Sequence, residues 1–388
     1  MKFFDQSLSK FPLASVSDYR LMAKKRLPRH LFEYLDGGAF DEVTSRKNRE
    51  DFQGIQLKKR VLHNVSNVNT NTNILGQNLD FPLILSPVGF AGIYARRGEV
   101  QAAKAAAKAK IPFSLSGVSI CSIEEIAQNT PEPFWFQFYM FKDQEYSLEL
   151  LQRIEAAHCP ILLMTVDLPA AGARYRDQRS RKSSQIVNFL DTLIHLNWWI
   201  DVRLRGTPLS IGNMPRSAPP LKDLSSMRQW MRDQHVKSIS WNDFEWVRAH
   251  WKGKILIKGI LDPEDAILAQ KTGADGIVVS NHGGRHLDGT LSTIAALPAI
   301  CDAVKGQMKV LIDGGITSGL DLFKALAVGA DACMIGKPWV CGLSANGEDG
   351  VSEILTILKN ELKIVMTHLG VSSIADINRN LIHGNCNT

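Results

Sequence analysis

The sequence predicts an α/β protein built as a (β/α)₈ barrel, the TIM-barrel architecture. The 388-residue chain contains eight short apolar runs, and segments with helical character lie between most of them. Strands that are apolar along their whole length are typical of a parallel sheet covered by helices. The eight runs are FPLILSPV (81–88), IPFSLSG (111–117), PFWFQFYM (133–140), CPILLMTVD (159–167), KILIKGI (254–260), DGIVVSN (275–281), KVLIDGG (309–315) and DACMIGK (331–337).

The segments between these runs are expected to form helices. GEVQAAKAAAKAK (98–110) is rich in alanine and lysine, which favour helix formation. SIEEIAQ (122–128) begins with serine and two early glutamates, as helix N-termini often do. A doubly wound open sheet is the alternative arrangement, but the chain contains no G-x-G dinucleotide fingerprint. The other predicted helices span 143–158, 242–251, 262–273, 292–306 and 318–329.

The whole chain, 1–388, is expected to form a single domain. Residues 1–80 would be a helical N-terminal extension, 81–346 would contain the barrel strands and helices, and 347–388 would form a long last helix and a tail. The connection from 168 to 241 is much longer than the about two to six residues that usually follow a strand. An insert of this length predicts a lid, a binding surface or a disordered segment after the fourth strand.

Composition limits the classes of function. The chain is 45% hydrophobic and has no apolar stretch long enough to span a membrane as a helix. Its net charge is +6, but the basic residues are scattered, so we expect no nucleic-acid partner. A mildly positive chain suits an anionic substrate or an anionic membrane surface. The six cysteines lack metal-binding spacing, which favours reduced thiols in a cytosolic compartment and no metal site.

Polar residues and glycines gather at the C-terminal ends of the predicted strands, where barrels of this class hold their active sites. Any one of them alone is more often a cap, a surface charge or a core residue. Their convergence at one end of the barrel is what favours an active site. They are Pro87, Val88, Gly89, Ser116, Gln137, Tyr139, Thr165, Asp167, Lys258, His282, Arg285, Asp313, Gly314, Gly315, Gly336 and Lys337.

Two glycine-containing turns follow the last two strands. They are DGGITSG (313–319) and IGKP (335–338). Glycines let backbone N–H groups approach a phosphate, and a following helix N-terminus adds a favourable dipole. The pattern indicates a phosphate-bearing cofactor, although two tight turns without a ligand would have the same composition.

The segment SNHGGRHLDG (280–289) resembles the signature of the FMN-dependent α-hydroxy-acid dehydrogenase and oxidase family. Within this family the chain is most similar to membrane-associated, quinone-linked bacterial members that oxidise L-lactate. The resemblance covers nearly the whole chain. Further matching segments are FEYLDGGAFDEVT (32–44), SPVGFAGIYARRGE (86–99), PFSLSGVSICSIEE (112–125), WFQFYM (135–140), TVDLPAAGARYRD (165–177), ISWNDFEWVR (239–248) and IKGILDPEDA (257–266).

The resemblance implies that L-lactate is oxidised to pyruvate and that electrons pass to membrane quinone. His282 would be the general base, whether the α-hydrogen of the substrate leaves as a proton or as a hydride. Asp167 would orient His282 and stabilise its protonated form. Arg174 and Arg285 would clamp the substrate carboxylate, because a planar guanidinium matches a carboxylate. The substrate oxygens would be bonded by Tyr34 and Tyr139.

The resemblance also implies how the chain holds FMN. Lys258 would face the N1–C2=O edge of the flavin, where negative charge accumulates on reduction. The ring would be hydrogen-bonded by Ser116, Gln137 and Thr165 and backed by residues 87–89. The phosphate would lie at the turns that contain Asp313, Gly314, Gly315, Gly336 and Lys337.

Three positions depart from the family pattern. His286 stands where a glutamine is usual, Thr317 near a usual arginine, and Lys337 where the last turn usually has arginine. Lysine is still a competent phosphate partner, but the loss of one cation would weaken FMN binding by about 1–3 kcal/mol. We therefore expect FMN to be retained but more easily removed than in a relative with both arginines.

Within the insert, residues 184–206 have the pattern of a helix lying in a membrane interface. The alternatives are a lid on the protein's own surface and an oligomer contact. The resemblance favours the membrane, and so predicts a peripheral protein on the cytoplasmic side of the inner membrane, assembled as a homo-oligomer. Its apolar face would contain Ile186, Phe189, Leu190, Leu193, Leu196 and Ile200, with Trp198 and Trp199 beside them.

Two other functions remain open at this point. A soluble oxidase would pass electrons to oxygen and make peroxide, and Gly89, where oxidases tend to have alanine, favours the dehydrogenase over it. A non-catalytic barrel that has lost its flavin would explain the altered phosphate turns. It would be colourless when purified, and the intact base, aspartate and arginines disfavour it.

Overall fold

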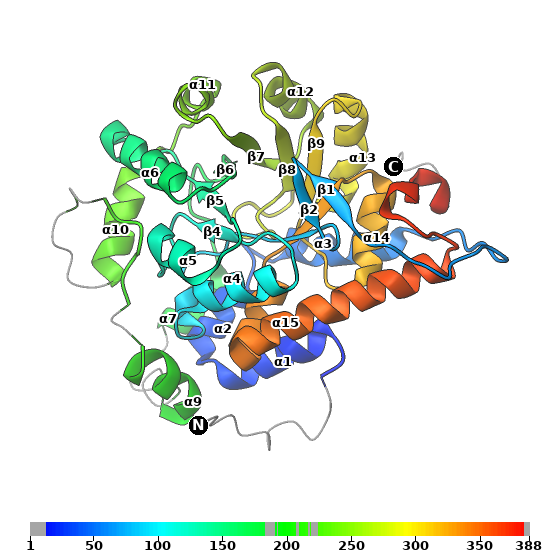
Figure 1. Cartoon of the computed structure of the whole chain (residues 1–388). Helices are drawn as coiled ribbons and strands as arrows, with labels where there is room; N and C mark the ends of the chain where they lie inside the picture. The colour runs from blue at the N-terminus through cyan, green and yellow to red at the C-terminus, as the bar shows by residue number, and fades with distance from the viewer. Residues whose placement is uncertain are drawn as a thin grey trace.

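The computed structural model describes residues 13–182, 191, 193–206, 209–215, 218 and 224–383. Its centre is a sheet of eight parallel strands in the order β3-β10-β9-β8-β7-β6-β5-β4 (Figure 1). All eight predicted strands are present, and the predicted barrel is confirmed. The strands are β3 (Leu83–Leu85), β4 (Ser114–Ser116), β5 (Trp135–Phe138), β6 (Ile161–Thr165), β7 (Lys254–Ile260), β8 (Gly276–Ser280), β9 (Lys309–Asp313) and β10 (Ala332–Ile335).

The barrel closes between its first two strands. Leu85 at the end of β3 forms a parallel bridge with Phe113, just before β4, and its N–H donates to the Pro112 carbonyl at 3.0 Å. On the other side, Ile84 of β3 pairs with Met334 of β10. Because nearly every strand residue is buried, the apolar runs in the sequence correspond to strands covered on both faces.

An antiparallel hairpin, β1 (Thr72–Ile74) and β2 (Gln77–Leu79), covers the N-terminal end of the barrel. Ile74 and Leu79 belong to the apolar cluster that fills the barrel interior. The Trp135 indole at the start of β5 donates to the Gln77 side chain at 2.6 Å. With this end covered, the C-terminal ends of the strands remain available for a cavity.

The outer helices agree with the predicted segments and have ordinary caps. Ser122, for example, accepts a hydrogen bond from the Glu125 N–H at 3.1 Å. The predicted final helix is the second part of α15, which is interrupted at Asn346 and Gly347 by non-helical backbone angles. The helices are α4 (Gly98–Lys108), α5 (Ile123–Asn129), α6 (Gln144–Ala156), α11 (Trp241–His250), α12 (Pro263–Lys271), α13 (Thr293–Val304), α14 (Gly319–Val328) and α15 (Lys337–His368).

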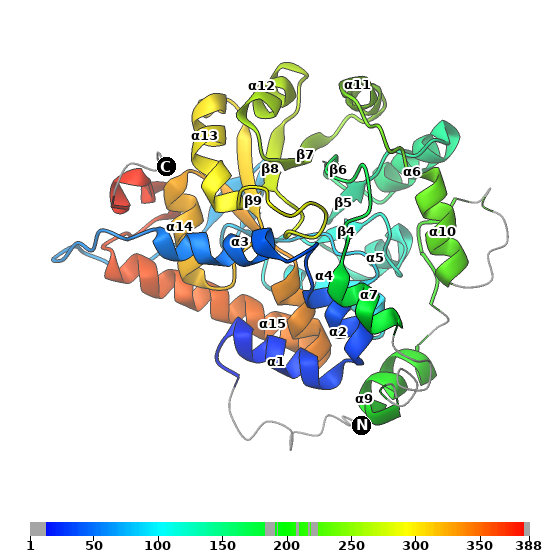
Figure 2. The same ribbon diagram turned by 180° about the vertical axis from the view of Figure 1, so that it is seen from behind.

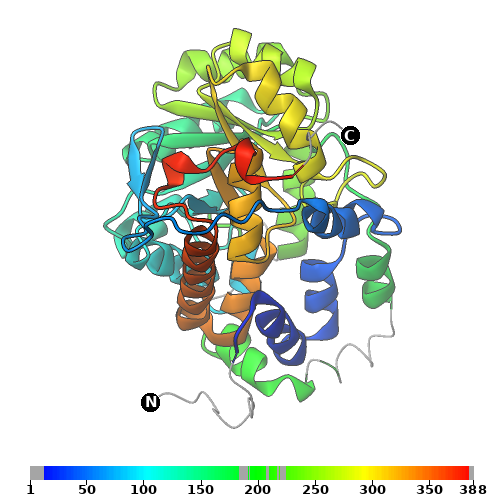
Figure 3. The same cartoon turned by 90° about the vertical axis from the view of Figure 1, so that its right-hand side faces the viewer.

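Three helices precede the hairpin: α1 (Val16–Arg26), α2 (Arg29–Asp36) and α3 (Val43–Gly54). Figure 2 shows α2 and α3 on one side of the barrel, together with α7 (Tyr175–Lys182) from the insert. Figure 3 shows α1, in dark blue, packed beside the orange α15. Apart from its hairpin and connecting loops, the described part of this N-terminal segment is helical, and it packs directly on the barrel.

The insert packs on the barrel as short elements. After α7 come α9 (Leu196–Trp198), a π-helical turn over Trp199–Leu204, and α10 (Leu224–Gln234). Of the predicted interfacial helix, residues 184–190 and 192 lie outside the described residues. Trp198 was expected beside its apolar face at the membrane, but this side chain is buried and its indole donates to the Ile93 carbonyl at 2.8 Å. Trp198 therefore anchors the insert to the protein.

Candidate active site

A cavity of about 510 Å³ lies at the C-terminal ends of the strands. This volume is in the range of small-molecule and cofactor sites. Three predicted site residues, Ser116, Thr165 and Asp167, lie behind its wall. The predicted residues that line it are Tyr34, Pro87, Val88, Gly89, Gln137, Tyr139, Arg174, Lys258, His282, Arg285, Asp313, Gly314, Gly315, Gly336 and Lys337.

The predicted base and its carboxylate are in contact. Nδ1 of His282 lies 3.1 and 3.2 Å from the two carboxylate oxygens of Asp167. Burial alone would raise the pKa of Asp167, but the adjacent His282 and Lys258 outweigh it and lower that pKa. Asp167 is therefore ionised and holds the imidazole by Nδ1, which leaves Nε2 as the nitrogen not engaged by Asp167.

Glycines make room for this pair. Gly259 has a φ of +116°, and a Cβ there would lie 2.5 Å from the Cβ of Asp167. His282 itself has a φ of +55° and is followed by Gly283 and Gly284 at +66° and +68°. A Cβ on Gly284 would lie 2.6 Å from the backbone nitrogen of Ser45 on α3. The loop after β8 thus needs glycine for its backbone angles and because α3 lies directly against it.

The two predicted substrate arginines converge on Tyr34. The guanidinium of Arg174 lies 4.9 Å from the Tyr34 ring centroid, and that of Arg285 lies 5.4 Å from it. Burial would raise the pKa of Tyr34, but these arginines, with Arg228, lower it. The cavity therefore has a strongly positive wall, which suits a carboxylate.

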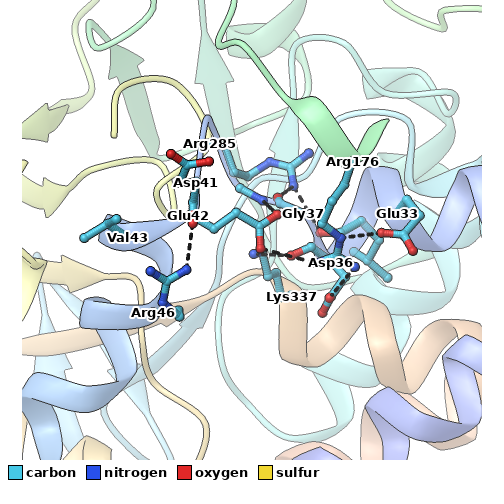
Figure 4. Close-up of polar contacts among 12 residues, drawn as sticks. Glu33, Asp36, Gly37, Asp41, Glu42, Val43, Arg46, Arg176, Arg285 and Lys337 are labelled. Atoms are coloured by element: carbon cyan, nitrogen blue, oxygen red, sulfur yellow. Dashed lines mark hydrogen bonds and ion pairs between the residues drawn. The ribbon is translucent and has the colours of Figure 1, made fainter. Parts of the chain in front are cut away.

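Arg285 is held from behind by the end of α2. It donates to the carbonyls of Tyr34 at 2.8 Å, Leu35 at 3.1 Å and Gly37 at 2.8 Å. Figure 4 shows Arg285 directed at Gly37. Burial lowers the pKa of the guanidinium. These three bonds to carbonyls fix the orientation of Arg285, and no carboxylate among the described residues forms an ion pair with it.

The predicted flavin-facing residues form a connected hydrogen-bond chain across three strand ends. The Ser116 hydroxyl donates to the side-chain Oε1 of Gln137 at 2.9 Å, and the side-chain Nε2 of Gln137 donates to the Thr165 hydroxyl at 2.9 Å. Lys258 is buried, and its Nζ lies 2.6 Å from a carboxylate oxygen of Asp313. Ser86 donates to the other oxygen of Asp313 at 2.9 Å.

The end of the cavity where the phosphate of the cofactor is predicted to lie, here called the phosphate end, contains Lys337 at the start of α15. Its Nζ donates to the Asp36 carbonyl at 2.8 Å (Figure 4). Burial, together with the nearby Arg285, lowers the pKa of this lysine to about 8. Thr317, in contrast, binds Asp321 through both its N–H and its hydroxyl, so its side chain contributes to the start of α14.

Several cavity residues were not predicted, and many of them belong to the N-terminal extension or form ion pairs with it. Arg176 forms ion pairs with Glu33, Asp36 and Glu42, a network visible in Figure 4. Ser45 and Arg49 of α3 also line the cavity. The resemblance of residues 32–44 to a family motif was the available signal, but it identified only Tyr34.

His286 packs edge-on against His282, with ring centroids 4.5 Å apart. Burial, together with the neighbouring His282, lowers the pKa of His286 to about 2, so this side chain is neutral at ordinary pH. Within the described ranges its Nδ1 is buried without a hydrogen-bond partner. His286 therefore adds bulk and no charge beside the base.

The cavity fits a phosphorylated flavin in its size, in its buried Lys258 and in its two glycine-containing backbone turns. Gly314 and Gly315, with φ of +114° and +87°, open the turn after β9. Residues 13–182 and the other described ranges contain no group of three His, Cys, Asp or Glu side chains arranged to hold a metal ion. The fold and site thus define a barrel oxidoreductase whose cofactor carries a phosphate.

The chain belongs to the FMN-dependent dehydrogenase family, whose model matches residues 23–384. It is accordingly an FMN-dependent enzyme. The residues predicted to hold the cofactor at 87–89, Gln137, Lys258 and the two glycine-containing turns line the cavity.

Named relatives and solved structures agree with this assignment. An L-lactate dehydrogenase of Alcaligenes faecalis is 47% identical over 95% of this chain and 98% of its own. The structure of (S)-mandelate dehydrogenase, described as a monotopic membrane protein, superposes with a TM-score of 0.92 at 34% identity and covers 97% of this chain and 100% of its own. A mandelate oxidase superposes with a TM-score of 0.81 at 33% identity, over 94% and 96% of the two chains.

Proposed function

We propose that this enzyme oxidises a small L-2-hydroxy acid, most specifically L-lactate to pyruvate, and passes the electrons to membrane quinone. The observation that carries the proposal is the His282–Asp167 pair, because its His282 lines the same cavity as Arg174, Arg285 and Tyr34. A held base beside a positive wall suits a substrate with a hydroxyl and a carboxylate on adjacent carbons. Relatives 47–48% identical to the chain are named L-lactate dehydrogenase, which favours lactate.

His282 is the proposed proton acceptor. Asp167 engages Nδ1, so Nε2 is the atom that takes a proton from the bound hydroxy acid. The imidazolium that forms is stabilised by the ionised Asp167 at 3.1 Å. FMN, when bound, supplies the two-electron acceptor for this oxidation.

The arginines and tyrosines orient the substrate. Arg174 and Arg285 approach the Tyr34 ring from the cavity wall and are proposed to bind the substrate carboxylate. Tyr34 and Tyr139 both line the cavity and are proposed to hydrogen-bond the substrate oxygens. Burial raises the pKa of Tyr139, so it is a neutral donor.

Anaerobic mixing of the purified protein with hydroxy acids tests the substrate. L-lactate, D-lactate, glycolate and L-mandelate are each added while the bleaching of the flavin absorbance is followed. We expect L-lactate to bleach the flavin fastest and D-lactate to leave it oxidised. Faster bleaching by L-mandelate would overturn lactate as the substrate, and no bleaching by any of the four would overturn the function.

The electron acceptor is tested by measuring peroxide. A soluble oxidase is the second candidate, because the chain is also similar to mandelate oxidase. Gly89 supports the dehydrogenase, because oxidases tend to have alanine at this position. An alanine would not fit here without a shift, since its Cβ would lie 2.7 Å from the Val118 side chain. We expect a quinone analogue to reoxidise the bleached flavin and oxygen to yield little peroxide. One peroxide per lactate, with no acceleration by quinone, would identify an oxidase.

The proposed membrane contact is the part of the predicted interfacial segment that the structure describes, residues 193–206. Leu193, Ile194, Leu196, Trp199 and Leu204, here called the insert patch, are exposed apolar residues. They lie beside Arg203 and Arg205, which are also exposed. An apolar surface flanked by arginines is typical of interfacial segments, and the similarity to a monotopic membrane protein supports this use. No helix in the described ranges is long and apolar enough to cross a bilayer.

Substitution within the insert patch tests membrane binding and leaves Trp198, which anchors the insert to the protein, in place. Ile194 and Leu204 are 76% and 65% exposed. The double variant Ile194→Glu, Leu204→Glu should fail to sediment with anionic phospholipid vesicles, while L-lactate still bleaches its flavin. Leu268→Glu on α12, where the leucine is 40% exposed, is the matched control and should sediment normally. Unchanged sedimentation of the double variant would remove the insert patch from this role.

A further inference from the structure

Helix α3 is fixed directly against the turn after β9, residues 313–319. A Cβ on Gly315 would lie 1.8 Å from the carbonyl oxygen of Asn48, so no side chain fits between the turn and the helix. The Asn48 side chain exchanges two 2.8 Å hydrogen bonds with Asn281 and accepts one from the Thr293 N–H at 3.2 Å. Helix α3 is thus held by the loops after β8 and β9 together.

The next residue of this helix is Arg49, which lines the same cavity as Gly314, Gly315 and Lys337. Its side chain is exposed, and among the described residues it forms no ion pair. The neighbouring Arg46 differs, because its guanidinium donates to the Asp41 carbonyl at 2.6 Å. Arg49 is therefore a cation at the cavity wall whose charge is not matched within the described structure.

The turn after β9 has no cation of its own. Its sequence, DGGITSG (313–319), contains neither lysine nor arginine, and Thr317 is bonded to Asp321. Lys337 is the nearby cation of the last turn. Burial and Arg285 lower the pKa of Lys337 the most, and Asp36 opposes them by raising it. Arg49 lowers the pKa of Lys337 further. Two cations that repel each other at one end of a cavity favour the binding of an anion between them.

We propose that Arg49, from helix α3 of the N-terminal extension, binds the phosphate of FMN together with Lys337. Lys337 is the first cation at this end of the cavity, and Arg49 supplies the second from helix α3, because the turn after β9 contains none. The loss of FMN affinity expected because Thr317 stands near a usual arginine is then offset in part. Retention of the cofactor thereby depends on the extension. The proposal concerns the cofactor alone and does not depend on which hydroxy acid is oxidised.

Comparison of FMN with riboflavin tests the proposal, because riboflavin is the same flavin without the phosphate. Apoprotein is titrated with each ligand while flavin fluorescence is followed. Arg49→Gln should raise the Kd for FMN roughly 10- to 100-fold, the usual size of a lost charge-assisted hydrogen bond. The Kd for riboflavin should stay within about 2-fold of its original value, because only the phosphate contact is removed. Arg49→Lys should retain more FMN affinity than Arg49→Gln.

Two further variants make the result specific. Lys47→Gln removes a positive charge from the same helix at a residue that does not line the cavity, so FMN binding should be nearly unchanged. Thr317→Arg in the Arg49→Gln background returns a cation from the turn and should restore FMN affinity. An unchanged Kd for FMN in Arg49→Gln, an equal loss for FMN and riboflavin, or an equal effect of Lys47→Gln would overturn the proposal.

Discussion

The two ends of the cavity are built in different ways. At the base end, His282, Asp167 and Gly259 all come from the C-terminal ends of barrel strands or the loops that follow them. At the phosphate end, the barrel supplies Lys337 and the glycine turn, while α3 presses on that turn and presents Arg49. The proposed base and its carboxylate therefore come from the barrel itself, whereas the proposed phosphate site combines the barrel with the extension. Variants at the base end should leave the Kd for FMN nearly unchanged, and variants at the phosphate end should leave the base pair intact.

The largest effect is expected at the base end. His282→Asn removes the proton acceptor and should slow anaerobic flavin bleaching by L-lactate about 10³-fold. The variant should remain yellow, and its Kd for FMN should stay within about 2-fold of the original value, because the phosphate end is untouched. Stopped-flow absorbance and FMN titration measure the two quantities. Bleaching at an undiminished rate would remove His282 from its role.

A backbone substitution should have the largest effect at the phosphate end. Gly315→Ala places a methyl group against the Asn48 carbonyl and must displace α3, so we expect FMN affinity to fall about 10²-fold. Gly273→Ala is the matched control: Gly273 has the same φ of +87°, but no atom lies within 4 Å of the point that a Cβ would occupy. The control should lose only about 1 kcal/mol of stability, as backbone strain, and keep its FMN. Equal FMN affinity in the two variants would contradict the packing argument.

FMN binding should weaken as pH rises through about 8, the lowered pKa of Lys337. Below this pH the lysine of the apoprotein is charged and attracts the phosphate; above it the lysine is neutral, and affinity should fall up to about tenfold per pH unit. Lys337→Arg should abolish the decline, and riboflavin binding should not show it. A decline that persists in Lys337→Arg would assign it to another group.

The smallest effect is expected for His286→Gln, although this residue contacts the base. Because the pKa of His286 is about 2, both side chains are neutral between about pH 5 and 9. The pH profile of kcat/KM for L-lactate should keep its shape, with rates within about 3-fold of the original. A titration step that disappears in the variant would show that His286 ionises during turnover.

The base end could be predicted from the sequence because strand ends of a parallel barrel converge by construction. Once eight apolar runs are placed as strands, His282 and Asp167 must lie at the same end. The docking of the extension could not be predicted in this way. The contacts of Arg285 with Tyr34 and Leu35 join residues about 250 positions apart, and helical periodicity does not specify the partner of a helix. The Trp198 side chain shows the same limit: it was expected beside an apolar face at the membrane, but its hydrogen bond to the Ile93 carbonyl holds it buried in the protein.

The contact between α3 and the barrel also sets an order of events during synthesis of the chain. The carbonyl of Phe52, at the end of α3, accepts a hydrogen bond from Lys324 of α14, a residue made 272 positions later. At about 5–20 residues per second, the ribosome needs roughly a quarter of a minute to a minute to cover that distance. Until the ribosome reaches Lys324 the end of α3 lacks this hydrogen bond, and until it reaches Lys337 the proposed phosphate site is incomplete. If Arg49 and Lys337 bind the phosphate as proposed, FMN is captured only after most of the chain has been made.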